Sequence, residues 1–201
     1  MKYVIVKEGA VIDNSAILGY RPSRNIAINR TRIGENARIR SNAVIYTNVS
    51  IGDNFETGHN VIIREENQIG HDFKIWNNSV IDYGCIIGNR VKIHSNVYIA
   101  QFTTIEDDVF IAPGVIVAND YHPGCGECMK GPTIRKGAKI GVNVTLLPRI
   151  TVGRNSLIGA GSVVTRDIAD NMLAFGNPAK IVCSIYELRC KTGLNKKPYL
   201  R

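Results

Sequence analysis

The sequence predicts an all-β protein in which short strands and turns coil into a triangular prism. Every sixth residue from Ile33 to Val117 is isoleucine or valine, with Thr57 as the exception. Hydrophobic residues make up 44% of the chain and aromatic residues only 7%, and this aliphatic, β-branched composition favours strand over helix. A period of six fits neither an α-helix nor a plain strand, but it does fit a short strand followed by a turn.

Each repeat unit also carries its own turn signal. Glycine often follows the aliphatic residue, as in Ile33-Gly34 and Ile51-Gly52, and Asn and Asp crowd the next positions. These residue types adopt the backbone conformations that tight turns require. Three units would close one coil, so residues eighteen apart should stack and pair their backbones at roughly 4.8 Å.

The repeat is interrupted once before it resumes. Seventeen residues separate Val117 from Ile134 where the repeat would give six, so eleven residues must leave the prism. We therefore expect an extruded loop at about 118–133. Loops on rigid scaffolds commonly carry function.

Composition limits the class of protein. A chain of 201 residues without a signal peptide or a long apolar run predicts a single cytoplasmic domain with no membrane span. The net charge of +8 suggests an anionic partner such as a phosphorylated small molecule. Nucleic acid is not expected, because the basic residues are scattered and form no recognised motif.

Stacking also predicts a polar column along one edge of the prism. Ile63, Ile81, Ile99 and Val117 are spaced by eighteen and share one face. Two residues after each of them come Glu65, Tyr83, Gln101 and Asn119. Because Gln, Tyr and Glu are less typical of turns than Asn, Asp and Gly, we expect the first three to bind a substrate below the loop.

From about Ile12 to Val182 the chain resembles the hexapeptide-repeat acyltransferases, on the repeat itself and on the segments IEDDVFIAP, VIVANDYHPG and IGAGSVVTRDIADNMLAFGNPAKIV. The resemblance implies a left-handed parallel β-helix, a hand that periodicity alone would not give. The predicted organisation is a β-helix domain at 1–182 and a tail at 183–201. A weak helical pattern from Ile181 to Arg189 predicts a short C-terminal helix.

The interruption holds the candidate catalytic residues. VIVANDYHPG resembles the point in galactoside and maltose O-acetyltransferases where a His-Pro pair leaves the β-helix, which implies that His122 is a general base. The same segment resembles nucleotide-sugar N-acetyltransferases, which carry an Asn-Asp pair matched here by Asn119 and Asp120. A hydroxyl acceptor needs a base such as histidine, whereas a neutral amine needs orientation and a proton acceptor. The motif therefore leaves N- and O-acetylation open.

The C-terminal segment resembles the acetyl-CoA-binding end of the same family. The match implies that Gly159 and Ala160 lie beside the pantetheine arm. It also implies that Thr165 and Arg166 lie near the adenosine end and Lys180 near the phosphates. Arginine and lysine suit phosphate groups, which gives part of the positive charge a specific place.

A metal site competes with the catalytic role of His122. His122, Cys125 and Cys128 have the spacing H-x2-C-x2-C, which is compact enough for structural zinc. Cys183 or Cys190 would have to supply a further ligand. If His122 binds a metal, it cannot also be the free base.

The resemblance implies acetyl-CoA-dependent acetylation of a sugar by a homotrimer with active sites between adjacent prisms. The first expectation is N-acetylation of a nucleotide-linked aminosugar for surface polysaccharide or glycan biosynthesis. The second is a sugar O-acetyltransferase, and an alternative of another class is a non-catalytic β-helix that serves as a binding or scaffold module.

Overall fold

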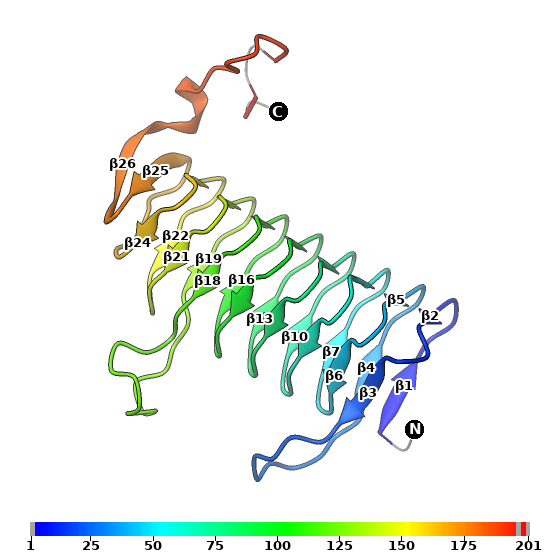
Figure 1. Ribbon diagram of the computed structural model, residues 1–201. Coiled ribbons are helices and arrows are strands. Elements are labelled where there is room, and N and C mark those ends of the chain that lie inside the picture. The colour runs from blue at the N-terminus through cyan, green and yellow to red at the C-terminus, as the bar shows by residue number, and fades with distance from the viewer. Residues whose placement is uncertain (1–2, 196–197, 200–201) are drawn as a thin grey trace.

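The computed structural model describes residues 3–195 and 198–199 of the chain. The described chain winds into a three-sided prism, the predicted left-handed parallel β-helix, with one sheet on each side (Figure 1). No helix among the described residues is both long and apolar enough to cross a bilayer.

The first sheet contains, in order, β1 (Val4–Val6), β4 (Thr31–Ile33), β7 (Ser50–Ile51), β10 (Gln68–Ile69), β13 (Ile86–Ile87), β16 (Thr104–Ile105), β19 (Thr133–Ile134) and β22 (Thr151–Val152). The second contains β2 (Val11–Ile12), β5 (Arg38–Ile39), β8 (Glu56–Thr57), β11 (Lys74–Ile75), β14 (Lys92–Ile93), β17 (Phe110–Ile111), β20 (Lys139–Ile140), β23 (Leu157–Ile158), β25 (Met172–Gly176) and β26 (Ala179–Ser184). The third contains β3 (Ile17–Tyr20), β6 (Val44–Tyr46), β9 (Ile62–Ile63), β12 (Val80–Ile81), β15 (Tyr98–Ile99), β18 (Ile116–Val117), β21 (Thr145–Leu146) and β24 (Val163–Val164).

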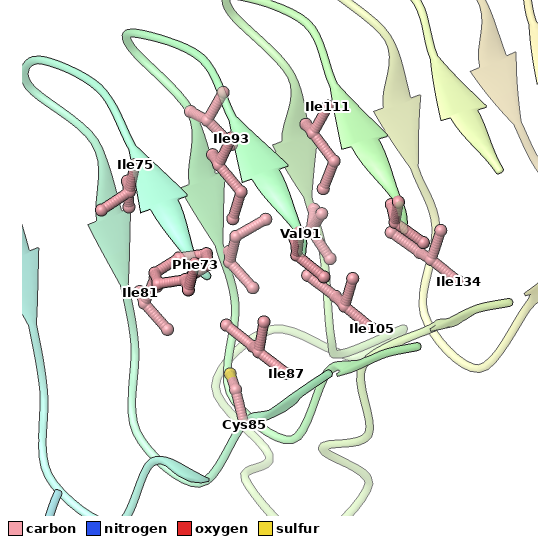
Figure 2. Close-up of a cluster of buried hydrophobic side chains, with 14 of the residues drawn as sticks. Phe73, Ile75, Ile81, Cys85, Ile87, Val91, Ile93, Ile105, Ile111 and Ile134 are labelled. Carbon is pink, nitrogen blue, oxygen red and sulfur yellow. The ribbon is translucent and has the colours of Figure 1, made fainter. Parts of the chain in front are cut away.

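Successive coils stack with the predicted spacing of eighteen. Ile63 pairs with Ile81, and Ile81 pairs with Ile99 in the third sheet. The repeated aliphatic residues point into the prism and form one continuous buried core, part of which is shown in Figure 2. Phe55 and Phe73 stack inside it with ring centroids 5.8 Å apart. This burial of regularly spaced apolar side chains holds the coils together.

The turns use the residue types that the sequence indicated. Asn42, Asn60 and Asn78 all have left-handed backbones, with φ between 57° and 59°. Their side chains also form a ladder, because Asn42 donates to Asn60 at 3.1 Å and Asn60 donates to Asn78 at 3.0 Å. Asparagine tolerates this conformation and its amide can both donate and accept, so the ladder adds contacts between coils at a corner.

Two loops leave the prism at the same corner, where the third sheet passes into the first. The predicted loop lies between β18 and β19, and the register across it jumps from 18 to 29 residues, as between Thr104 and Thr133. A second loop lies between β3 and β4, where Val4 pairs with Thr31. Figure 1 shows both loops projecting from the same side, with several coils between them.

The C-terminal end differs from the prediction. Where a helix was expected from Ile181 to Arg189, Ala179–Ser184 forms β26, which pairs antiparallel with β25 across the Asn177-Pro178 turn. The helix is reduced to one 3₁₀ turn, η1 (Ile185–Glu187), capped by Ser184. The predicted helix does not form, because pairing with β25 satisfies the backbone hydrogen bonds of this segment instead. Residues 196–197 and 200–201 of the predicted tail lie outside the described part.

Candidate functional site

The corner between the two loops carries the predicted polar column. Glu65, Tyr83, Gln101 and Asn119 follow β9, β12, β15 and β18, so the repeat places all four on the same corner. Next to the 118–132 loop, Asn119 Nδ2 donates to Gln101 Oε1 at 2.7 Å. Gln101 Nε2 then donates to Asp82 Oδ2 at 2.7 Å. These half-buried amides therefore form a chain of hydrogen bonds that leads into the prism.

At the other end of the column, Glu65 is covered. Its side chain is 0% exposed and receives Arg24 Nη1 at 3.0 Å and Arg64 Nη2 at 3.0 Å. The Arg24 guanidinium comes from the 21–30 loop and also lies 3.8 Å from the centre of the Tyr83 ring. Contact between Glu65 and a substrate, as the sequence predicted, therefore requires Arg24 to move away. In this structure the arginine faces solvent at that point instead.

Charge is concentrated in this part of the column. Burial alone would raise the pKa of Glu65, but hydrogen bonds from its own backbone, Arg24 and Arg64 bring that pKa below its ordinary value. Burial and the hydrogen bond to Asp82 raise the pKa of the Tyr98 hydroxyl, which donates to Asp82 Oδ2 at 2.8 Å. Glu65 is thus held ionised and Tyr98 is held neutral.

Four residues of this network were not singled out from the sequence: Arg24, Arg64, Asp82 and Tyr98. Arg64 and Asp82 each stand one position before a column member and eighteen residues apart, so a second column could have been read there. Arg24 gives no such signal, because it lies in a loop outside the repeat. Only the folded loop brings it to Glu65.

The 118–132 loop is anchored at several points and leaves His122 at the surface. Asp120 Oδ1 accepts the backbone N–H of His122 at 2.8 Å, so this carboxylate shapes the turn after Asn119. The Tyr121 hydroxyl donates to the Pro148 carbonyl at 2.7 Å. The His122 side chain is exposed and its ring makes no hydrogen bond within the described chain. An exposed imidazole that lacks protein partners is available to accept a proton from a bound molecule.

The predicted zinc site is not formed. Within residues 3–195 and 198–199, no group of three or more His, Cys, Asp or Glu side chains is arranged to hold a metal. The Cys125 N–H closes a turn onto the His122 carbonyl at 3.0 Å, and the compact spacing H-x2-C-x2-C is used for turns instead of a cluster. Cys183 lies in β26, and Cys190 comes after η1. The described residues therefore do not support the prediction of structural zinc.

The predicted cofactor residues lie around the last coils. Gly159 and Ala160 follow β23 at the corner where the second sheet passes into the third, and Gly159 N–H donates to the Ala174 carbonyl at 2.8 Å. A Cβ on Gly159 would come within 2.7 Å of the Phe175 side chain, so only glycine allows this approach.

Thr165 and Arg166 follow β24 at the corner that carries both loops, and Lys180 lies in β26 opposite Phe175. Arg166 and Lys180 are exposed. The third sheet is thus flanked by the glycine corner on one side and the loop corner on the other.

Two family models match the chain. The model for the GMPPB C-terminal domain matches residues 27–122, and the bacterial transferase hexapeptide model (six repeats) matches residues 131–166. The first match ends inside the 118–132 loop and the second begins near the end of that loop. They agree with the coils and with the position at which the repeat breaks.

Curated relatives match part of the chain. The galactoside O-acetyltransferase of Escherichia coli K12 is 40% identical over 89 residues, which are 41% of this chain and 44% of that one. A dTDP-3-amino-3,6-dideoxy-α-D-galactopyranose 3-N-acetyltransferase of Aneurinibacillus thermoaerophilus is 52% identical over 48 residues, 24% of this chain and 25% of that one. The chain spans about half the length of the curated relatives it matches.

Solved structures share the fold over most of the chain. A Bacillus cereus protein assigned as an acetyltransferase superposes with a TM-score of 0.56 and 25% identity, covering 85% of this chain and 84% of the other. The polySia-specific acetyltransferase NeuO has a TM-score of 0.56 at 24% identity, covering 90% and 80%. The second likeness concerns the fold alone.

Proposed function

We propose that this chain is a hexapeptide-repeat transferase and that it transfers the acetyl group of acetyl-CoA to a sugar, as its matches to that repeat and to acetyltransferases support. The observation that carries the proposal is the position of His122. Its ring is exposed and makes no hydrogen bond within the described chain, on an anchored loop three residues after Asn119. An imidazole at such a place suits the removal of a proton from an attacking hydroxyl or amine.

The chemistry that this arrangement supports is direct acyl transfer. The acceptor nitrogen or oxygen forms a bond to the thioester carbonyl carbon, and the bond from that carbon to sulfur breaks. His122 takes the proton of the attacking group and returns it to the departing thiolate, so that free CoA leaves as a thiol. Asp120 contributes indirectly, since its carboxylate fixes the backbone of His122 at 2.8 Å.

Acetyl-CoA would bind on the surface of the last coils. Whereas Gly159 lies against Phe175, a Cβ on Gly161 would meet no atom within 4 Å, so the corner beside Ala160 offers open space for a thin pantetheine chain. Exposed Arg166 and Lys180 are suited to its phosphates, and Thr165 lies beside Arg166. Arg166→Ala and Lys180→Ala should each weaken the binding of acetyl-CoA by about 1.5–3 kcal/mol.

For the acceptor, we favour the amino group of a nucleotide-linked sugar. A relative named as an N-acetyltransferase of such a sugar supports this choice, and the positive charge of the chain suits a nucleoside diphosphate. A relative named as a galactoside O-acetyltransferase supports the second candidate, a sugar hydroxyl. In both, Tyr83 and Gln101 lie along the acceptor's path.

A homotrimer is part of the proposal. Ile86, Phe102 and Ile116 are large apolar side chains that are 53%, 41% and 45% exposed on neighbouring coils. Contact with further copies would cover such side chains and would turn the loop corner into a cleft. Light scattering should give three times the chain mass, and an active monomer would contradict this part.

The function is tested by measuring CoA release with UDP- and dTDP-aminosugars and with simple sugars. We expect turnover with an aminosugar nucleotide and a drop in kcat of roughly 10²–10⁴-fold in His122→Ala. His71→Ala is the matched control, because His71 is an exposed histidine at another corner, where it contacts Asp53. The scaffold alternative predicts no release with any acceptor and no thermal stabilisation by CoA.

The co-substrate site is tested through the KM for acetyl-CoA. Arg166→Ala and Lys180→Ala should raise it about 10–100-fold, the equivalent of the binding cost above, with kcat less affected. Arg154→Ala is the control, because Arg154 is an exposed arginine at the corner between the first and second sheets. An unchanged KM in both variants would contradict this placement.

A further inference from the structure

The two carboxylate oxygens of Asp82 have separate partners. Asp82 is only 5% exposed. Its Oδ1 accepts from Arg64 Nη1 and from the Tyr83 backbone N–H, both at 2.8 Å. Its Oδ2 accepts from the Tyr98 hydroxyl at 2.8 Å and from Gln101 Nε2 at 2.7 Å. One oxygen is therefore held by the arginine network and the other is directed into the polar column.

The Asp82 carboxylate fixes the direction of the hydrogen bonds made by the Gln101 and Asn119 side chains. A carboxylate can only accept, so the Gln101 amide must turn its nitrogen towards Asp82. Its oxygen then faces Asn119, and Asn119 Nδ2 donates to it at 2.7 Å. The atom left over is Asn119 Oδ1, which accepts no hydrogen bond from the described chain. Reversing either amide would set oxygen against oxygen or nitrogen against nitrogen.

We propose that Asp82 is a positioning residue that, through Gln101, aligns Asn119 so that its side-chain oxygen accepts a hydrogen bond from the attacking group. This rests on the proposed acetyl transfer. An attacking amine has a second N–H besides the one that His122 would remove, and Asn119 Oδ1 is suited to bind it. The site thereby favours an amine, which keeps a second donor hydrogen at the reacting atom, over a hydroxyl, which has only one. Gln101 becomes a link to Asn119 instead of a substrate ligand.

Two substitutions can reverse and restore the donor-to-acceptor direction of the hydrogen bonds between positions 82, 101 and 119. Asp82→Asn gives position 82 a donor, so the Gln101 amide is no longer held in one orientation. Gln101→Glu sets two carboxylates against each other and leaves no donor between them. In the double variant, the glutamate at 101 accepts from both neighbours, so Asn119 again donates from Nδ2. Arg64 and the Tyr83 N–H keep the oxygen of the new asparagine on their side, which turns its nitrogen towards position 101.

The test compares kcat with the aminosugar acceptor in the two single variants and the double variant. We expect about 10-fold losses in each single variant, the equivalent of one hydrogen bond in the transition state, and recovery to within about 3-fold of the parent in the double variant. The KM for acetyl-CoA should stay unchanged throughout. Asp108→Asn is the control, because this aspartate accepts from Arg90 Nε at 2.6 Å at another corner, and its kcat should equal the parent's.

A second measurement is independent of activity. In the ¹⁵N-labelled parent, one Asn119 Nδ2 proton should be protected from exchange, and this protection should be lost in Asp82→Asn and regained in the double variant. The proposal would be overturned if the protection of this proton were the same in all variants. It would also be overturned if kcat of the double variant were no higher than that of the slower single variant. A parent that turns over no acceptor but shows the expected protection would overturn the acetyl transfer and leave the alignment of Asn119 standing.

Discussion

Replacing Glu65 by glutamine tests the contact that holds the 21–30 loop over the polar column. The Glu65 carboxylate accepts Arg24 Nη1 and Arg64 Nη2 on Oε1, both at 3.0 Å, and Arg64 Nε on Oε2 at 3.2 Å. A glutamine can keep its oxygen at the first position only by setting its NH₂ against Arg64 Nε. The substitution therefore removes the charge, loses one charge-assisted hydrogen bond and opposes two donors inside a fully buried group.

The expected cost follows from these contacts. One lost hydrogen bond to a charged group costs about 1.5–3 kcal/mol. The two arginines are 33% and 26% exposed, so water solvates part of what they lose, and each keeps another carboxylate, Glu66 or Asp82. We expect Glu65→Gln to lower the free energy of unfolding by about 2–3 kcal/mol. For a domain of this size that lowers Tm by about 4–12 °C.

The dependence on pH provides a second signature. The pKa of Glu65 is lowered in the folded chain, so its ionised form contributes stability above the ordinary glutamate value of 4.5, and this stability is lost as the pH falls through the folded value. The gap between parent and variant should therefore be full at pH 7 and should narrow below about pH 4.5.

Thermal unfolding followed by circular dichroism at pH 7, 5, 4 and 3 measures both effects. Glu66→Gln is the matched control, because Glu66 also binds Arg24, at 2.8 Å, but its side chain is 40% exposed, and its loss should cost about 0–1 kcal/mol. Equal stability of Glu65→Gln and the parent at pH 7 would refute the reasoning. A gap of the same size at pH 3 as at pH 7 would also refute it.

Three further predictions concern the core, the loop and its cysteines. Phe73→Ala removes a fully buried ring from the prism and should cost about 3–5 kcal/mol in urea unfolding, and a smaller loss would mean that the coils close the cavity. Tyr121→Phe loses the hydrogen bond to Pro148 and should increase amide exchange in the 118–132 loop, with Tm changed by only about 1–3 °C. Cys125→Ser and Cys128→Ser should leave both Tm and zinc content at the parent's values, and a fall in zinc on elemental analysis would reinstate a metal site.

The architecture was already determined by the sequence, because a repeat encodes the same local decision many times. An inward aliphatic residue at every sixth position and Asn, Asp or Gly at the turns specify the coil, and their agreement outweighs single exceptions such as Thr57. The same register placed Gln101 and Asn119 on one corner and showed where residues must leave between Val117 and Ile134. Stacking turns spacing into geometry, so these predictions needed no tertiary information.

Outside the repeat, only the tertiary structure decided which residues come into contact. Arg24 lies in a loop with no register of its own, and its place on Glu65 follows from how that loop folds back across the coils. Ala179–Ser184 became a strand because β25 offers a pairing partner that a local pattern cannot reveal. The direction of the amide chain from Asp82 to Asn119 depends on which oxygen meets which donor. Spacing places side chains near one another, but contacts between particular atoms exist only once the chain has folded.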